Sequence, residues 1–234
     1  SSGTWSLLGV ESGRPVINED TYHLNYTNEG GFNRTIRLLK NIMGLWIYQE
    51  CKRTWDKSGR PASFDELENG ALKAEPFMAF IDPDDLSFLR PGGMPEKVRE
   101  FCRKTGQKIP DSKPQMVRCI MESLALKYRM ALEGLEQITG YSIPVLHIVG
   151  GGCKNTLLSQ FTANALGRPV ITGPIEATSS GNLISQLIAL GEVKSLAEGR
   201  ALIKNSFPTV EYTPFEAASW DMAYERFLKI ASNN

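Results

Sequence analysis

The sequence contains no long apolar segment and no excess of charge of either sign. In its 234 residues, no apolar run approaches the roughly 18 residues that a membrane-spanning helix needs. Lys plus Arg and Asp plus Glu each number 26, so net charge favours neither a nucleic acid nor an anionic membrane as a partner. We expect a protein that binds neither, although backbone N–H groups remain able to bind a phosphate.

Cysteine and histidine are too few and too scattered to indicate a metal site. The four cysteines form no CxxC pair, and His23 and His147 lie far apart. Cys102 and Cys119 can meet if their segments pack together, but reduced thiols in a cytoplasmic protein are the favoured interpretation. Residues 1–13 lack the basic and apolar regions of a secretory signal and begin abruptly inside a predicted strand. We therefore expect a cytoplasmic protein and a chain cut from a longer one.

The first quarter of the chain predicts three strands and a helix. Segments 4–10 and 21–27 are rich in aromatic and β-branched residues, which predicts two antiparallel strands, and 34–39 is expected to be a third. From Asn41 to about Trp55, apolar residues recur at helical spacing. Asn41 is the expected N-cap of this helix.

The stretch 56–112 is less regular. Ser63 and Glu66 fit a capping box that opens a short helix, because each can satisfy a backbone N–H of the other. Residues 77–81 are predicted to form a strand and residues 94–105 a helix. We interpret the whole stretch as an insertion outside the core of the fold.

The second half of the chain alternates between helices and strands. A long amphipathic helix is predicted at 114–138 and ends at Gly140. Buried strands are expected at 145–149 and 169–171, and further helices at 155–166, 176–190, 195–205 and 215–231. Three strands followed by alternating helices and strands predict an α/β fold of the ribonuclease-H-like, actin-like ATPase type. The expected sheet is mixed, five-stranded and flanked by helices.

The first motif with chemical potential is the opening tetrapeptide, SSGT. Gly3 lies between hydroxyl residues at a turn, where consecutive backbone N–H groups can converge on an anion. The Thr4 hydroxyl adds a donor for a phosphate oxygen or for metal-bound water. Alone the motif is weak, because most such tripeptides are plain turns.

The second motif is a buried strand that runs into three glycines and then a helix, in 147–160. Gly150, Gly151 and Gly152 leave bare backbone at the carboxyl end of the strand, where α/β proteins bind ligands. Asn155 can cap the helix or hydrogen-bond the edge of an adenine. The spacing GGGxxN is not the GxGxxG fingerprint, which argues against an NAD-dependent oxidoreductase. A tight turn that binds no ligand remains the alternative.

The third motif, EATSSGN at 176–182, is predicted to start a helix that packs against the glycine turn. Gly181 is expected to permit a close approach of this helix. A structural role is favoured over direct contact with a ligand.

Together these segments resemble the FGGY family of carbohydrate kinases. SSGTWSLLG resembles the family's second phosphate-binding segment, LHIVGGGCKNTLLSQFTANALGRPV its adenosine segment, and EATSSGN the stretch that follows. TNEGG (27–31) and LLKNIMGLWIYQE (38–50) resemble specifically the members that phosphorylate L-rhamnulose. The likeness extends over most of the chain and is loosest in 56–112.

The resemblance implies that residues 1–234 are the carboxyl-terminal, nucleotide-binding domain of a two-domain kinase that uses ATP and Mg2+. The implied ATP-binding residues are Gly3 and Thr4 at the terminal phosphates, Asn41 and Gln49 lining the cleft, Gly151 against the adenosine, Gly150 and Gly152 shaping the turn, and Asn155 near the adenine. Without the resemblance, Asn41 is better interpreted as a helix cap and Gln49 as part of a solvated helix face.

The implied reaction transfers a phosphoryl group from MgATP to the 1-hydroxyl of L-rhamnulose. The catalytic aspartate and most sugar contacts would belong to the amino-terminal kinase domain, so no catalytic residue is expected in this chain, and Glu19 and Asp20 receive no catalytic role. Two alternatives remain open. One is an FGGY kinase for another ketose or polyol, such as fuculose, xylulose or glycerol. The other is a non-catalytic actin-like nucleotide-binding module.

Overall fold

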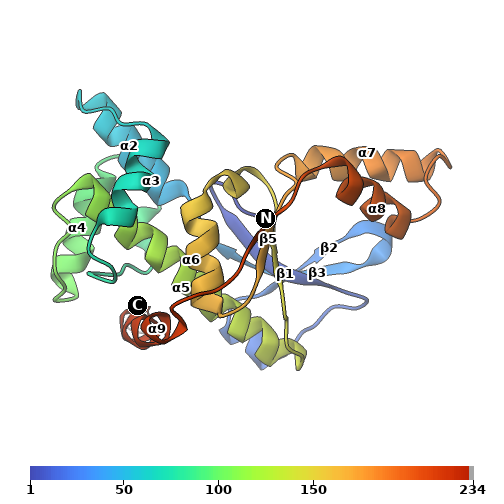
Figure 1. Cartoon of the computed structure of the whole chain (residues 1–234). Helices are drawn as coiled ribbons and strands as arrows, with labels where there is room; N and C mark the ends of the chain where they lie inside the picture. The colour runs from blue at the N-terminus through green and yellow to red at the C-terminus, as the bar shows by residue number, and fades with distance from the viewer. Residues whose placement is uncertain (232–234) are drawn as a thin grey trace.

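The computed structural model describes residues 1–231 and contains two small sheets surrounded by helices (Figure 1). The strands are β1 (Ser6–Ser12), β2 (Thr27–Gly30), β3 (Ile36–Ile42), β4 (Leu146–Ile148), β5 (Val170–Thr172) and β6 (Val210–Tyr212). One sheet has the order β1-β3-β2 and is antiparallel throughout. The other has the order β4-β5-β6, with β4 and β5 parallel and β6 antiparallel to β5.

The α/β class is confirmed, but the prediction of one five-stranded sheet is wrong. Each sheet has three strands, because β1 and β4 are not paired with each other in the described residues. β6 was not expected from the sequence; it is only three residues long and pairs with β5. A strand of three residues carries little periodicity, so no pattern in the sequence predicted β6.

The helices occupy three regions of the molecule. They are α1 (Glu19–His23), α2 (Trp46–Lys57), α3 (Phe64–Lys73), α4 (Met94–Lys104), α5 (Lys113–Thr139), α6 (Thr156–Leu166), α7 (Ala177–Ala189), α8 (Leu196–Ser206) and α9 (Ala217–Ala231). Figure 1 shows α2, α3 and α4 on one side of the molecule and α7 and α8 on the other, with α5 and α6 between them. Within residues 1–231 no helix combines the length and hydrophobicity that crossing a bilayer requires.

The strand predicted at 21–27 is wrong, because a short helix occupies most of it. Asn18 caps α1 through a reciprocal box in which its side chain accepts from the Thr21 N–H at 2.9 Å, while the Thr21 hydroxyl accepts from the Asn18 N–H at 3.0 Å. This local cap outweighs the strand propensity of the aromatic residues that follow. The strand β2 begins only at Thr27.

The prediction that Asn41 caps a helix is also wrong. Asn41 lies within β3, which continues to Ile42 because it pairs with β1 along its whole length. The helix α2 starts later, and its N-cap residue Leu45 makes no side-chain cap. The Leu45 and Trp46 N–H groups instead donate to the carbonyls of Gly3 and Thr4, both at 3.0 Å. The opening tetrapeptide therefore supplies the acceptors for the start of α2.

The helices with strong sequence signals are confirmed. Ser63 and Glu66 form the expected capping box at the start of α3. Gly140 ends α5 in the left-handed conformation at φ +75°, a conformation that glycine adopts without steric cost. The predicted helices at 94–105, 155–166, 176–190, 195–205 and 215–231, and the strands at 145–149 and 169–171, all occur with small shifts at their ends.

The stretch 56–112 contributes side chains to the hydrophobic core, and its interpretation as an insertion stays a prediction. No strand forms at 77–81. The Phe77, Phe80 and Ile81 N–H groups donate instead to the side chains of Glu122, Gln107 and Ser123, at 2.8–2.9 Å. Phe80 and Ile81 are completely buried in the same hydrophobic cluster as α5. The expectation of a strand failed because side chains distant in sequence satisfy this backbone.

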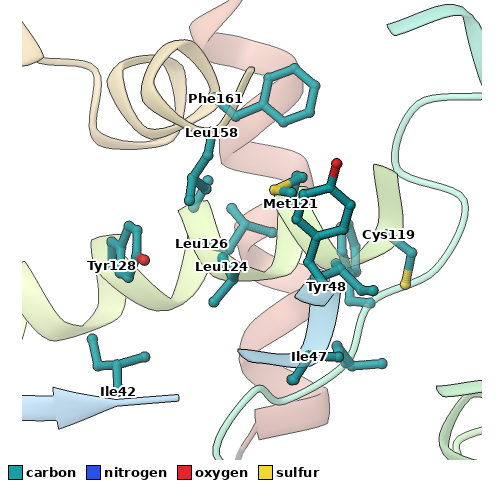
Figure 2. Packing of buried hydrophobic residues seen from close by; sticks show 14 of the residues in the cluster. Ile42, Ile47, Tyr48, Cys119, Met121, Leu124, Leu126, Tyr128, Leu158 and Phe161 are labelled. Atoms are coloured by element: carbon teal, nitrogen blue, oxygen red, sulfur yellow. The ribbon is translucent and has the colours of Figure 1, made fainter. Parts of the chain in front are cut away.

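The core is organised around α5, which is buried on several of its faces. Figure 2 shows its side chains between those of the β3–α2 region and those of α6. The labelled members of the cluster are Ile42, Ile47, Tyr48, Cys119, Met121, Leu124, Leu126, Tyr128, Leu158 and Phe161. Cys119 also meets Cys102, as the sequence allowed, and both are free thiols. The hydrogen bond with Cys102 and burial raise the pKa of Cys119, which keeps this thiol protonated.

A buried ion cluster fixes α5 to the loop before α4. The Lys127 ammonium lies 2.8 Å from an Asp82 carboxylate oxygen and 3.0 Å from one of Asp84. Burial opposes its charge, but the two carboxylates outweigh burial and raise the pKa of Lys127. Asp84 also accepts the Met43 N–H at 2.9 Å, so the cluster reaches the end of β3.

We predict that Lys127→Ala lowers the free energy of unfolding by about 3–5 kcal/mol, because it leaves the buried Asp82 carboxylate and the half-buried Asp84 carboxylate without a cation. Removing the exposed cation of the Arg37–Glu29 pair with Arg37→Ala should cost less than about 1 kcal/mol. Urea unfolding of the two variants and the wild type checks the difference. Equal losses in both variants would contradict the role assigned to the cluster.

Candidate functional site

The candidate site forms where the opening tetrapeptide meets two other segments. The Ser2 N–H donates to the Val149 carbonyl at 2.8 Å, and the Ser2 carbonyl accepts from the Gly152 N–H at 2.8 Å. On the other side, the Gly3 carbonyl accepts from the Leu45 N–H at 3.0 Å. The tetrapeptide is therefore held between the glycine turn and the start of α2.

Thr4 and Gln49, two of the predicted residues, are brought into contact. The Thr4 hydroxyl donates to the Gln49 side-chain carbonyl at 3.1 Å. Thr4 is exposed, and Gln49 lies half-buried on the first turn of α2. Because the Gln49 side-chain oxygen accepts this hydrogen bond, it fixes the direction in which the Thr4 O–H points. The pair presents polar groups to solvent beside the start of a helix, where the helix dipole favours an anion.

The three glycines of the turn differ in how much space a side chain would have at each position. A Cβ on Gly152 would lie 2.1 Å from the Ser2 hydroxyl oxygen, and one on Gly150 would lie 2.9 Å from the Ser2 carbonyl oxygen. Gly150 also has a positive φ of +94°. Gly151 is exposed, and a Cβ there would meet nothing within 4 Å. Two of the glycines therefore serve the contact with Ser2, and Gly151 alone presents open backbone to a ligand.

Asn155 caps α6 and is buried, with 5% of its surface exposed. Its side-chain oxygen accepts the Leu158 N–H at 2.7 Å, and its amide nitrogen donates to a Glu68 carboxylate oxygen at 2.9 Å. Both ends of the amide thus have partners within the protein. The capping role that the sequence left open is present. A contact between Asn155 and an adenine stays a prediction, and it requires the bond to Glu68 to open.

Glu68 is a feature of this region that sequence reasoning missed. It lies on α3, 2.9 Å from Asn155 and 3.4 Å from the Tyr48 hydroxyl. Burial raises the pKa of Glu68 to about 7. No local pattern could have found it, because its partners come from distant parts of the sequence.

Asn41 is exposed on β3, directly opposite Leu7 on β1. Among residues 1–231, no hydrogen bond links its side chain to Thr4 or to the glycine turn. Neighbouring Ile42 is buried, so Asn41 lies on the opposite face of this sheet from the core. Its role at a nucleotide stays a prediction.

The third motif starts α7 beside the glycine turn. The Gly150 N–H donates to the Pro174 carbonyl at 3.1 Å, which places the loop before α7 against the turn. The expectation that Gly181 permits a close approach of this helix is wrong. Gly181 is exposed, and a Cβ there would meet nothing within 4 Å.

The polar groups gathered at the site are neutral donors and acceptors. They are a hydroxyl, a carboxamide and backbone N–H groups, the types that contact phosphate oxygens in anion-binding turns. Within the described part of the chain, no group of three or more His, Cys, Asp or Glu side chains is placed to hold a metal ion.

Comparisons with known proteins identify the family to which the chain belongs. Residues 1–190 match the family model for the carboxyl-terminal domain of the FGGY carbohydrate kinases. The rhamnulokinase of Bacteroides thetaiotaomicron is 49% identical over 227 residues, which cover 97% of this chain and 46% of that protein. The rhamnulokinase of Bacillus subtilis is 46% identical over 214 residues, which cover 92% of this chain and 44% of that protein. The chain spans just under half the length of these curated relatives.

Solved structures share the fold at low sequence identity. A xylulose kinase from Lactobacillus acidophilus superposes with a TM-score of 0.73 at 15% identity, covering 99% of this chain and 46% of that one. A gluconate kinase from the same organism gives a TM-score of 0.72 at 17% identity, with the same coverage. The glycerol kinase of Plasmodium falciparum, solved with ADP, superposes with a TM-score of 0.65 at 17% identity. This match covers 97% of this chain and 46% of that one. These likenesses show that the chain has the fold of sugar kinases.

We predict that Gly152→Ala lowers the free energy of unfolding by about 1–3 kcal/mol, because the new methyl group overlaps Ser2. Gly151→Ala should change it by less than about 1 kcal/mol, since its position is open. Chemical unfolding measures both. A destabilising Gly151→Ala combined with a neutral Gly152→Ala would reverse the assignment.

The raised pKa of Glu68 predicts a pH effect on stability. Between the ordinary carboxyl pKa and about 7, the folded state retains a proton that the unfolded state has released, so stability falls as pH rises through this window. Glu68→Gln keeps an acceptor for Asn155 and removes the titration. We expect the unfolding midpoint of the variant to fall less than that of the wild type between about pH 4.5 and about pH 7, the limits of this window. Identical pH profiles would exclude this contribution.

Proposed function

The chain belongs to the FGGY family of carbohydrate kinases, and we propose that it is the nucleotide-binding half of a rhamnulokinase. The proposed reaction transfers the γ-phosphate of ATP to the 1-hydroxyl of L-rhamnulose, giving L-rhamnulose 1-phosphate. The observation that carries the substrate assignment is the 49% identity to a rhamnulokinase along nearly the whole chain. The proposed cytoplasmic location follows from the same assignment.

The Thr4 hydroxyl is proposed to contact the terminal phosphates. Gln49 holds this hydroxyl at the start of α2, and the single hydroxyl proton would turn from the Gln49 side-chain oxygen to a phosphate oxygen when the nucleotide binds. Phosphoryl transfer depends mainly on positioning and on stabilising charge at the phosphate oxygens, which a fixed hydroxyl and backbone N–H groups can supply. Gly3 is placed beside Thr4 at the same phosphates, as the family resemblance implies.

Gly151 is proposed to lie against the adenosine. It is the glycine of the turn whose backbone is open, while Gly150 and Gly152 hold the turn against Ser2. Asn155 keeps the turn in place by capping α6 and bonding Glu68. We place Asn155 and Asn41 at the edges of the proposed nucleotide site, as the family resemblance implies.

Mg2+ is proposed to arrive with ATP and, when bound, to neutralise charge on the phosphate oxygens. The donors of this chain fit that role only in part. The Thr4 hydroxyl suits a contact with metal-bound water, but the described residues offer no carboxylate cluster for direct ligation. Direct ligands would come from the phosphates and from the other half of the protein.

The remaining chemistry is assigned to the amino-terminal kinase domain, the proposed partner of this chain. A carboxylate there would accept the proton of the attacking sugar hydroxyl, and most sugar contacts would lie there too. Closure of the two domains would exclude water, so that ATP is transferred to the sugar rather than hydrolysed.

The test of the proposed function is ATP-dependent phosphorylation by the full-length protein, with L-rhamnulose, L-fuculose, D-xylulose and glycerol as acceptors. We expect a strong preference for L-rhamnulose. Preference for another acceptor would keep the ATP site and overturn the sugar assignment. Nucleotide binding without activity on any acceptor would favour a non-catalytic actin-like module instead.

We predict that Thr4→Ala lowers kcat/KM of the full-length enzyme about 10²-fold, because a donor to the transferring phosphate is lost. Thr4→Ser keeps the hydroxyl and should recover most of this activity. Steady-state kinetics with varied ATP measure both variants. An unaffected Thr4→Ala enzyme would remove Thr4 from the phosphate site.

Gly151→Leu should raise the KM for ATP by at least about tenfold, because the side chain occupies the space proposed for adenosine. Gly13→Leu is the matched control, since Gly13 is also exposed with open space around its Cα. Thermal unfolding of both variants should stay close to the wild type. An equal KM for ATP in the two variants would contradict the placement of the adenosine.

A further inference from the structure

Glu68 lies where three elements of the candidate site come together. Its carboxyl oxygen Oε1 is 2.9 Å from the Asn155 amide nitrogen, at the start of α6, and 3.4 Å from the Tyr48 hydroxyl of α2. Tyr48 directly precedes Gln49, and the Asn155 N–H donates to the Gly152 carbonyl at 3.0 Å. Glu68 of α3 is therefore joined both to the helix that carries Gln49 and to the glycine turn.

The Asn155 side chain is committed to partners within the protein. Its oxygen accepts the Leu158 N–H at 2.7 Å, and its nitrogen donates to Glu68. Only 5% of its surface is exposed. Turning this amide toward a ligand would remove the cap of α6 and leave a backbone N–H of its first turn without a partner. The polar group that remains available beside Asn155 is the Glu68 carboxyl.

One oxygen of the Glu68 carboxyl has no partner in the protein. Asn155 and Tyr48 both bond Oε1, and among residues 1–231 nothing donates to Oε2. The side chain is half-buried, and burial raises its pKa to about 7, with no Lys or Arg of the described residues close enough to oppose the shift. A half-buried carboxyl without a cation is costly for folding and is the kind of group that functional sites retain.

Ordered structure sets the orientation of this carboxyl. α3 begins at the capping box of Ser63 and Glu66, just before Glu68. The Tyr48 ring belongs to the hydrophobic cluster (Figure 2), and Asn155 is held by its own cap. Two fixed neighbours at Oε1 restrict the direction in which Oε2 can point. The free oxygen is therefore positioned before a ligand arrives, which lowers the entropy lost on binding.

We propose that Glu68 selects the purine base of the nucleotide, its free oxygen accepting a hydrogen bond from the 6-amino group of adenine. The proposal deepens the proposed function and rests on it, because it presupposes that adenosine lies against Gly151. Asn155 is then a positioning residue, which acts on the base through Glu68. A purine with a carbonyl group at position 6 would place one acceptor against another and leave both unpaired.

The chemistry of the free oxygen favours a base over the other parts of a nucleotide. An ionised carboxyl accepts hydrogen bonds, donates none and repels phosphate, whereas a neutral base with an amino group at its edge can approach it. Gly151, whose backbone is open, is joined to Asn155 by the short turn Gly151–Lys154. A flat base on Gly151 and the Glu68 carboxyl are thus neighbours of the same turn.

Nucleotide binding by the full-length protein tests the proposal. At pH 8, where Glu68 is mostly ionised, titration calorimetry should give a Kd for inosine diphosphate at least about tenfold above that for ADP, because a hydrogen bond is lost and an acceptor is left unpaired. Purine riboside diphosphate, which has only hydrogen at position 6, should bind with an intermediate Kd. Equal Kd values for ADP and inosine diphosphate would overturn the proposal.

Two matched variants identify the residue responsible. Glu68→Gln keeps an oxygen for the Asn155 amide and replaces the free acceptor with an NH2 donor, so the ratio of the Kd for inosine diphosphate to that for ADP should fall at least about tenfold. Asp65→Asn removes the same charge from an exposed side chain of α3 and should keep the wild-type ratio. An unchanged ratio in Glu68→Gln, or an equal fall in Asp65→Asn, would overturn the proposal.

The sugar takes no part in these measurements, so the two proposals can fail separately. ADP binding without discrimination between the bases would overturn only the role of Glu68. A full-length protein that binds none of the three nucleotides would remove the proposed nucleotide site, and the role of Glu68 with it. If Glu68 served the fold alone, Glu68→Gln would shift the thermal midpoint and leave the ratio of Kd values unchanged, which would also overturn the proposal.

Discussion

The candidate site depends on the two backbone hydrogen bonds that join Ser2 to Val149 and Gly152. They hold the opening tetrapeptide against the glycine turn, and the tetrapeptide in turn supplies the acceptors at which α2 begins. Thr4 and Gln49 meet because the tetrapeptide is hydrogen-bonded both to the glycine turn and to the start of α2. The absence of side chains at Gly150 and Gly152 lets the two backbones approach this closely.

The site is consistent with one half of a phosphoryl-transfer enzyme. It offers a positioned hydroxyl, open backbone and the start of a helix, which suit binding and orienting a nucleotide. The residues that would move a proton or contact the sugar are assigned to the other half. A division of this kind makes catalysis dependent on how the two domains close, so residues far from the phosphates can influence the rate.

The parts of the fold that could be predicted are those with local causes. Ser63 and Glu66 predict the start of α3, and Gly140 predicts the end of α5, because capping interactions involve residues only a few positions apart. Asn41 was misplaced because pairing between β1 and β3 is non-local and outweighs the helical pattern nearby. For the candidate site, Thr4 and Gly151 came from local motifs and Gln49 from the family resemblance alone, and their roles at a nucleotide stay predictions. Glu68 did not, because only tertiary packing brings it to Asn155.

The contact between Ser2 and Val149 also has consequences for how the chain folds. Its partners stand near opposite ends of a long stretch of sequence, so the contact cannot form until most of the chain has left the ribosome. During that interval β1 and β3 can already pair, while the backbone groups on the other edge of β1 remain without a neighbouring strand. An edge left open in this way is a template for wrong pairing with another chain. That edge is therefore covered at Leu7 only after the segment that holds Ser2 has been fixed against Val149.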